Sequence, residues 1–148
     1  MKRGQLKISF SMIVSIFLII IFISFAFYAI KKFMGIQDIV IVEKFSEDFQ
    51  RDIDKIWRGG QGSQPVSYSL PTNVEKICFV DYYSPTSENE KELYQKLKQL
   101  FYEKENLFFY PIGSGQGKDA ITLEHIDIEK ITSQENPYCI NNVKGDVS

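Results

Sequence analysis

The hydrophobic residues of this chain are concentrated in one long run near its start. Residues 8–30 contain no charged side chain, and their only polar members are Ser9, Ser11, Ser15, Ser24 and Tyr28. A helix rises about 1.5 Å per residue, so this run would span roughly 35 Å, enough to cross a hydrocarbon core of about 30 Å. Lipid offers no partner for backbone groups, so a spanning segment has to be helical. The pattern predicts a transmembrane helix over residues 8–32, preceded by a basic segment, residues 1–7.

The run has the properties of a retained anchor rather than of a cleaved secretory signal. It exceeds the roughly 7–15 apolar residues of a signal-peptide core, and no small-x-small cleavage site follows it. Lys31 and Lys32 come directly after it and are expected at the membrane interface. We therefore expect a single-pass membrane protein whose helix stays attached to everything downstream.

Residues 33–57 continue with a second helical pattern, which is amphipathic. Apolar residues recur on one stripe and charged residues cover the opposite side, as in a helix with one buried face. The stripe consists of Ile39, Val42, Phe45, Phe49, Ile53, Ile56 and Trp57. It can pack on the chain's own domain, which we favour, or face another chain in a juxtamembrane coiled coil. Gly35 is the expected position of a kink between the two helical patterns.

A loop and a mixed domain are predicted after this helix. The segment RGGQGSQP, residues 58–65, cannot sustain a helix because it contains three glycines and a proline. Residues 66–148 predict a β-hairpin (66–70 and 74–83, with a turn at 71–73), a helix over 88–104 opened by a capping box of Ser87 and Glu90, strands over 106–112 and 120–128, and a last strand near the C-terminus. We expect an α+β fold, a small and mainly antiparallel sheet covered by helices on one face.

Charge is divided unequally along the chain. Residues 1–32 carry five basic and no acidic side chains, whereas the other 116 residues carry 12 basic and 19 acidic ones, a net charge of −7. An acidic domain excludes a basic nucleic-acid interface, so no nucleic-acid partner is expected. Lys2, Arg3 and Lys7 precede the apolar run, whereas Lys31 and Lys32 follow it directly and Lys44 comes later, so the bias toward the N-terminal side is small. The positive-inside rule therefore favours a cytoplasmic N-terminus and an extracytoplasmic C-terminal domain.

The two cysteines, Cys78 and Cys139, both follow the apolar run, so only one intramolecular pairing exists. If they form a disulfide, the domain belongs in an oxidising exterior. The alternative is a pair of buried thiols in a reduced domain.

The opening MKRGQLKISF, followed by a long apolar helix, resembles the class III signal peptide of archaeal type IV pilin-like proteins. The matching residues are Arg3, Gly4 and Gln5. The resemblance implies that residues 1–4 are a leader, that a prepilin peptidase cuts after Gly4, and that the helix remains attached, in a filament core or in the membrane. The chain departs from the family at Ser9, where many members carry glutamate, and at Lys7, close to the apolar run. As a whole it also resembles small archaeal membrane-anchored proteins of unassigned role.

Several residues suggest a binding or catalytic site, but the sequence around each of them does not support one. GSGQGKDA, residues 113–120, has three residues where a phosphate loop needs four, and Asp119 replaces its Ser or Thr. His125 is the only histidine, and two distant cysteines do not form a zinc cluster, so no metal or cofactor is expected. Residues 81–88, DYYSPTSE, mix aromatics with carboxylates and could bind a cation or sugar, although a loop ending in a helix cap is the favoured interpretation. A nucleophilic pair would need His125 beside Cys78 or Cys139.

These patterns favour a non-catalytic structural or interaction protein anchored by one helix, and the resemblance implies that it lies at the archaeal cell surface. Its expected partners are the lipid bilayer and either another protein or further copies of the chain. The first alternative is a pilin-like filament subunit processed between Gly4 and Gln5. The second, from a different class, is a membrane-anchored enzyme that uses residues such as His125 and Cys139.

Overall fold

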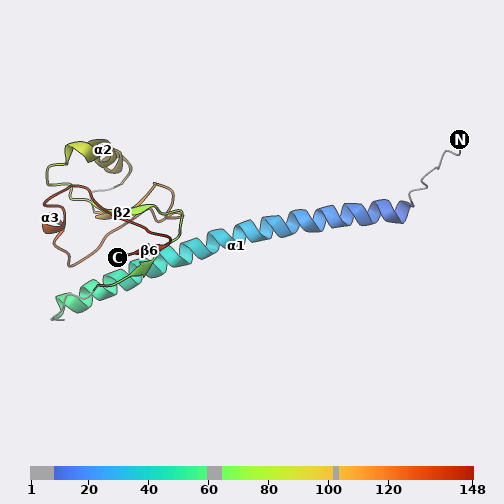
Figure 1. Ribbon diagram of the computed structural model, residues 1–148, viewed down its shortest axis with the longest axis horizontal. Coiled ribbons are helices and arrows are strands. Elements are labelled where there is room, and N and C mark those ends of the chain that lie inside the picture. The colour runs from blue at the N-terminus through green and yellow to red at the C-terminus, as the bar shows by residue number, and fades with distance from the viewer. Residues whose placement is uncertain (1–8, 60–64, 102–103) are drawn as a thin grey trace. The chain divides into compact units, whose positions relative to one another are not determined.

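The computed structural model describes residues 9–59, 65–101 and 104–148, and its longest element is the N-terminal helix α1, Phe10–Trp57 (Figure 1). The chain forms two compact units, Met1–Ile36 and Gln37–Ser148. α1 begins directly after Ser9 and continues through Gly35, where the sequence indicates a kink. It ends at Trp57, after which Gly59 adopts a φ of 106° that suits glycine.

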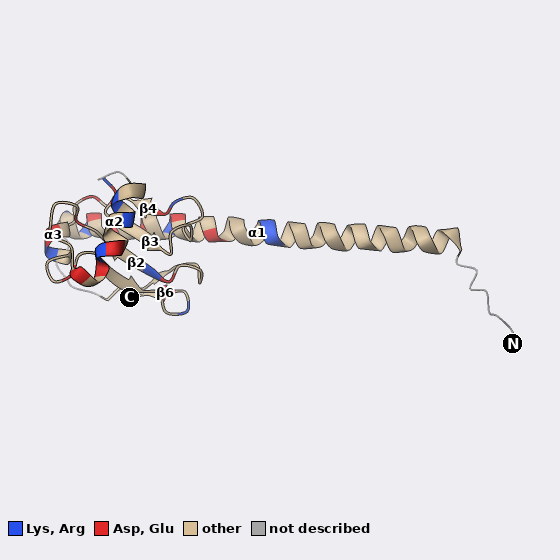
Figure 2. Cartoon of the chain, turned by 90° about the horizontal axis from the view of Figure 1, so that it is seen from above, with Lys and Arg blue, Asp and Glu red and all other residues tan. Residues whose placement is uncertain are grey.

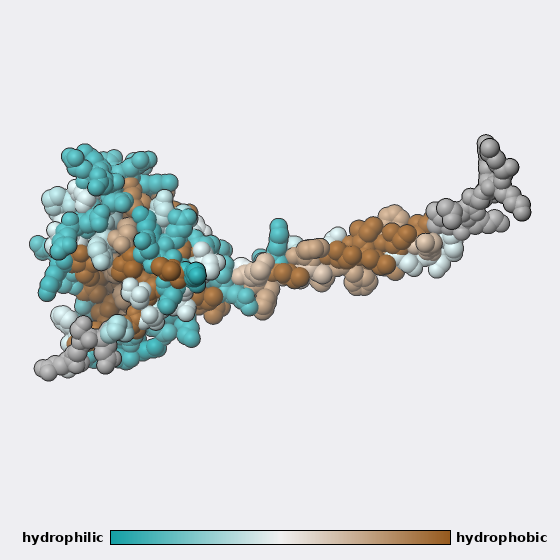
Figure 3. All heavy atoms as spheres, viewed as in Figure 1, coloured by the Kyte–Doolittle hydropathy of each residue, from teal (hydrophilic) through white to brown (hydrophobic). Residues whose placement is uncertain are grey.

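The first unit contains the apolar part of α1. Every side chain from residue 10 to residue 34 is exposed, and no charged residue precedes Lys31 among those described (Figure 2). Two serine hydroxyls in this part donate to helix carbonyls, Ser15 to Ser11 (2.9 Å) and Ser24 to Ile20 (2.8 Å), which removes much of their polarity. This stretch is long and apolar enough to cross a membrane (Figure 3). It fits the predicted single-pass anchor.

The second unit is built on a four-stranded antiparallel sheet with a separate two-stranded sheet. The order of the larger sheet is β4, β3, β2, β5, where the strands are Ala120–Ile121, Leu107–Tyr110, Lys76–Phe79 and Tyr138–Asn141. The smaller sheet pairs β1, Tyr68–Ser69, with β6, Asp146–Val147. Together with the helices, these strands confirm the predicted α+β fold class.

The predicted β-hairpin is wrong, because β1 pairs with β6 and not with β2. The expected turn does form: the Val74 N–H donates to the Pro71 carbonyl (3.0 Å), while the Leu70 N–H bonds to Gly145 (3.0 Å). β2 instead occupies the centre of the large sheet, between β3 and β5. Its apolar residues explain this, since a strand covered on both faces favours a continuous apolar run.

The helix predicted over residues 88–104 is present but shorter. A 3-10 turn, η1 (Glu88–Glu90), leads into α2, Lys91–Leu100. The capping box is wrong, because the Ser87 hydroxyl makes no cap bond and instead accepts a hydrogen bond from the Asn136 N–H (3.0 Å). A tertiary partner has replaced the local one.

The strand predicted over residues 120–128 is largely wrong. β4 ends at Ile121, and a short helix, α3 (Ile128–Ile131), follows. The Asp127 carboxylate accepts a hydrogen bond from the Lys130 N–H (3.1 Å) and so caps this helix. The C-terminal segment, by contrast, forms two strands, β5 and β6, rather than one.

Helices cover both faces of the large sheet, which corrects the expectation of one covered face. On one face, Val42 and Phe45 of α1 are buried among Phe79, Leu107 and Phe109, with Phe49 and Ile53 packed at the edge of this cluster. On the other, Leu97 of α2 is buried against Val80 and Phe108. α1 therefore packs on its own domain. The ends of the predicted stripe are exposed: the exposed fractions of Ile39, Ile56 and Trp57 are 44%, 62% and 66%.

We expect Phe45→Ala to destabilise the full-length protein by about 3–5 kcal/mol, because a fully buried ring is replaced by a cavity. Ile56→Ala, on the same helix but exposed, is the matched control and should cost less than about 0.5 kcal/mol. Denaturant unfolding in detergent micelles, followed by near-ultraviolet circular dichroism, measures both. Equal effects would contradict the packing of α1 on the sheet.

Candidate functional site

Cys78 and Cys139 form a disulfide between neighbouring strands. They lie directly opposite each other in the pairing of β2 with β5, with Cα atoms 4.1 Å apart. The bond closes a loop of 61 residues, which on the chain-entropy model stabilises the fold by about 4 kcal/mol. Because neither cysteine keeps a thiol, the considered nucleophilic pair with His125 is absent.

His125 lies in the connection between β4 and α3 and not on a strand surface. Its Nδ1 is 3.0 Å from the Asp54 carboxylate, and its ring stacks on Trp57 with centroids 5.0 Å apart. Two hydrogen bonds lower the pKa of Asp54: the one from His125 has the larger effect, and the one from Gln50 the smaller. The histidine thus joins the C-terminal end of α1 to the segment after β4, which is a structural role.

Gln50 makes a second connection between the same two segments. Its side-chain oxygen accepts from the Glu124 N–H (2.9 Å), and its side-chain nitrogen donates to the Glu124 carbonyl (3.2 Å). The same nitrogen donates to Asp54 (2.9 Å). The Gln50 side-chain amide thus bonds to both the N–H and the C=O of one residue, as the backbone of a neighbouring strand would.

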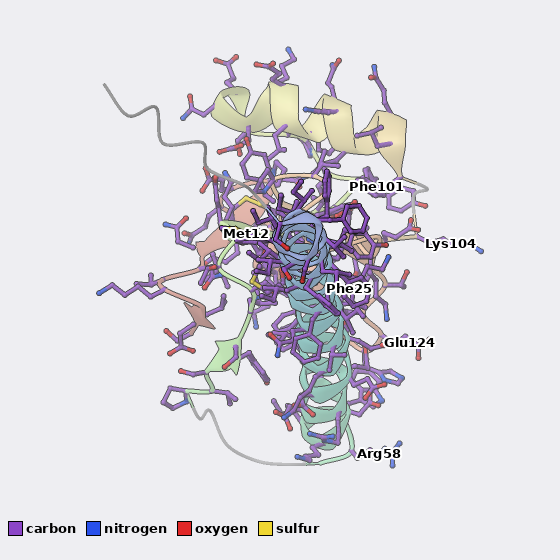
Figure 4. All side chains as sticks on the ribbon, turned by 90° about the vertical axis from the view of Figure 1, so that its right-hand side faces the viewer. Met12, Phe25, Arg58, Phe101, Lys104 and Glu124 are labelled. Atoms are coloured by element: carbon purple, nitrogen blue, oxygen red, sulfur yellow. A yellow bond between two sulfur atoms is a disulfide. The ribbon has the colours of Figure 1, made fainter. Side chains whose placement is uncertain are left out.

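An open groove of about 630 Å³ runs beside this connection, between one flank of α1 and the outer strand β4. Its lining combines charged residues with the edge of the sheet: Ser46, Glu47, Gln50, Arg51, Asp54, Glu105, Lys118, Ala120, Ile121, Thr122 and Leu123. Figure 4 shows the labelled Lys104 and Glu124 on the same side of the domain. This groove is a candidate binding surface of the second unit.

Some charged groups around the groove have partners of opposite charge, and one carboxylate oxygen has no hydrogen-bond donor in the described part of the chain. Arg51 is paired with Asp48, and Lys118 lies 3.7 Å from Glu43. The Oε2 atom of Glu105 is buried and has no hydrogen-bond partner among the described residues. A buried carboxylate oxygen without a donor is costly.

The loop over residues 81–88 uses its polar groups internally. The Asp81 carboxylate accepts from the Tyr83 N–H (2.9 Å) and the Ser84 hydroxyl (2.6 Å). The buried Asn136 side chain accepts from the Asp81 N–H (3.1 Å) and donates to the Asp81 carbonyl (2.7 Å). This network supports the interpretation as a structural loop over that as a cation or sugar site.

The glycine-rich segment 113–119 is closed by its own carboxylate. Asp119 accepts from the Gly115 N–H (2.9 Å), and a Cβ on Gly115 would come within 2.5 Å of the Lys118 carbonyl. The Gly115 N–H is therefore not free to bind a phosphate. Within residues 9–59, 65–101 and 104–148, no group of three His, Cys, Asp or Glu side chains could hold a metal ion. The predicted processing site, Gly4 and Gln5, lies outside the described residues.

Sequence reasoning missed the groove altogether. Its two walls, around Gln50 and Thr122, are far apart in the chain, and neither carries a motif. The available signal was weak: Gln50 is an uncharged polar residue on the flank of an amphipathic stripe.

Tyr68→Phe should destabilise the protein by about 1 kcal/mol, because it removes the hydrogen bond from the tyrosine hydroxyl to Asp52 (3.0 Å) but keeps the ring. Burial, and then this bond, raises the pKa of Tyr68 to about 12. A raised pKa stabilises the fold fully below the unfolded-state value near 10, and this contribution is lost as the pH rises toward 12. The stability difference between wild type and variant should therefore shrink over that range.

Unfolding titrations of both proteins between neutral and alkaline pH measure this difference. Tyr83→Phe, which alters a side chain that is 86% exposed, is the control. A difference that stays constant or grows with pH would show that the Tyr68 hydroxyl does not bind Asp52 in solution.

No family model, curated protein or solved structure matches this chain at a significant level.

Proposed function

We propose that this chain is a single-pass membrane protein that holds a small, non-catalytic interaction domain on the extracytoplasmic side, at the archaeal cell surface. The observation that carries the proposal is the continuous helix α1, which is apolar and exposed over residues 10–30 and belongs to a disulfide-containing domain from Gln37 onward. No other segment of the described chain covers this apolar stretch, whereas lipid would cover it.

The side of the membrane is argued from charge and from the disulfide. Basic residues slightly favour a cytoplasmic N-terminus. The bond between Cys78 and Cys139 agrees with an oxidising compartment, because cytosolic proteins rarely keep disulfides. Both arguments favour a domain outside the cytoplasm.

The absence of a catalytic role is part of the proposal. The residues that suggested chemistry are engaged in structural contacts: the two cysteines with each other, and His125 with Asp54 and Trp57. The groove beside β4 offers hydrogen-bonding groups and charge, which suits recognition of a partner.

Cysteine labelling of intact cells tests the topology. Tyr83→Cys places a third cysteine at a highly exposed position of the domain, and a membrane-impermeant maleimide should label it without permeabilisation. Leu6→Cys, on the other side of the apolar run, should react only after the cells are permeabilised. The reverse pattern would show that the domain lies in the cytoplasm. Extraction of the full-length protein without detergent would show that α1 is not a membrane anchor.

A second candidate function is a pilin-like filament subunit processed after Gly4. One observation favours it: α1 is a single helix whose first part is exposed and apolar and whose second part packs on the chain's own domain, which is also the plan of the pilin-like proteins that the N-terminus resembles. Processing would leave this helix attached to the domain.

Mass spectrometry of the mature protein separates the two candidates. Cleavage would give an N-terminus at Gln5, and Gly4→Leu should block it by placing a bulky side chain where the peptidase requires glycine. An intact N-terminus, or loss of Met1 alone, would eliminate the pilin-like candidate and leave the uncut anchor.

A further inference from the structure

The larger sheet of the second unit has one edge that lies open along a groove. β4 is the outer strand of this sheet and pairs with β3 alone among the described strands. The groove described above lies along its free side, with α1 forming the opposite wall. An edge strand presents unpaired N–H and C=O groups, which is a template for pairing with another chain.

The hydrogen bonds made by residues 119–123 show which backbone groups face the groove. Odd-numbered residues bond toward β3: Asp119 accepts from Phe109 (2.9 Å), and Ile121 accepts from Asn106 (3.1 Å). The Asn106 side chain donates to the Leu123 carbonyl (2.9 Å) and accepts from the Leu123 N–H (2.7 Å). In an extended chain, successive residues direct these groups to opposite sides. Those of residues 120 and 122 therefore point into the groove.

Gln50 demonstrates the pairing that this edge can make. Glu124 is the next even-numbered residue, and its N–H and C=O both bond to the Gln50 amide. Thr122, two residues earlier, is exposed, and no hydrogen bond joins its backbone to another described residue. A peptide backbone is an amide like that of Gln50 and can make the same pair of bonds at Thr122.

The dimensions of the groove suit a short extended segment. The residues that α1 contributes run from Ser46 to Asp54, which is about 12 Å along a helix at 1.5 Å per residue. An extended chain covers about 3.3 Å per residue, so this wall matches about four residues of a bound strand.

Charge indicates what one of those residues carries. The two cations of the lining, Arg51 and Lys118, already have acidic partners, and Asp54 is bonded to His125. Glu105 has a buried oxygen without a partner in the described chain. Glu105 lines the groove, so turning its side chain toward a bound lysine or arginine would give this oxygen a donor through a charge-assisted hydrogen bond.

We propose that the groove between α1 and β4 binds an extended segment of a partner protein by strand addition. The segment's backbone bonds to Ala120 and Thr122, and a lysine or arginine side chain reaches Glu105. Main-chain bonds supply the affinity in this mode, and the charged contact supplies the selectivity. The proposal deepens the interaction role proposed above and rests on it.

The probe is a fluorescent peptide, acetyl-Val-Thr-Lys-Thr-Val-amide, titrated against the full-length protein in nanodiscs and followed by anisotropy. We expect a dissociation constant of roughly 0.1–1 mM, as for a few backbone bonds and one charged contact. Two N-methylated versions, with methyl groups on alternate amides in the two registers, test strand addition without altering the protein. One should bind at least about tenfold more weakly, because its blocked N–H groups face β4, and the other should bind normally.

Protein variants test the same contacts from the other side. Thr122→Pro should weaken binding about tenfold by removing one backbone donor, whereas Thr122→Ala, which keeps that donor, should change it less than about twofold. Glu105→Gln should abolish the preference for the lysine peptide over the same peptide with glutamate at the centre.

Four results would overturn the proposal. These are no binding at millimolar peptide, equal binding of both N-methylated registers, a lysine preference unchanged by Glu105→Gln, and photo-crosslinking of the groove to a second copy of this chain. None of them would affect the anchor or the topology, because those are read from cysteine labelling and extraction.

Discussion

Burial of one stripe of α1 against the large sheet is the interaction on which the second unit depends. Val42 and Phe45 are 1% and 2% exposed, and the Phe45 ring meets that of Phe109 edge-on at 5.7 Å. Each such side chain contributes about 1.5–3 kcal/mol, more than the 0–1 kcal/mol typical of exposed ion pairs like those along the helix. The same contact holds the polar flank of α1 beside β4, so the groove is a consequence of the core.

The two edges of the sheet are treated differently. At one edge, β5 is tied to the central strand by the disulfide of Cys78 with Cys139. At the other, β4 is short, and two side-chain amides bond the backbone that follows it: Asn106 from the β3 side and Gln50 from the α1 side. Side chains thus replace strands where the sheet stops, and the backbone of Thr122 is left between them. This asymmetry is the basis on which we propose recognition at the β4 edge.

Local patterns predicted the elements best where one segment's own chemistry decides them. The charge-free run, the amphipathic stripe and the faces of α2 follow from periodicity, because apolar side chains at helical spacing need a helix to share a surface. The prediction of a hairpin over residues 66–83 was wrong, because one segment's own pattern does not decide which strand it pairs with. Nearness in sequence suggested that β1 and β2 pair, but β2 gained more burial between β3 and β5. Ser87 likewise bonds to Asn136 in place of its local cap.

By itself, the sequence determined that the chain has an apolar helix able to span a membrane, an amphipathic continuation of it, and a mixed domain. Only the tertiary structure decided that the two cysteines meet, that helices cover both faces of the sheet, and that Gln50 and Asp54 reach Glu124 and His125. The reason is physical. Periodicity states which face of an element avoids water, but the partner that covers that face is selected by packing among segments distant in the chain.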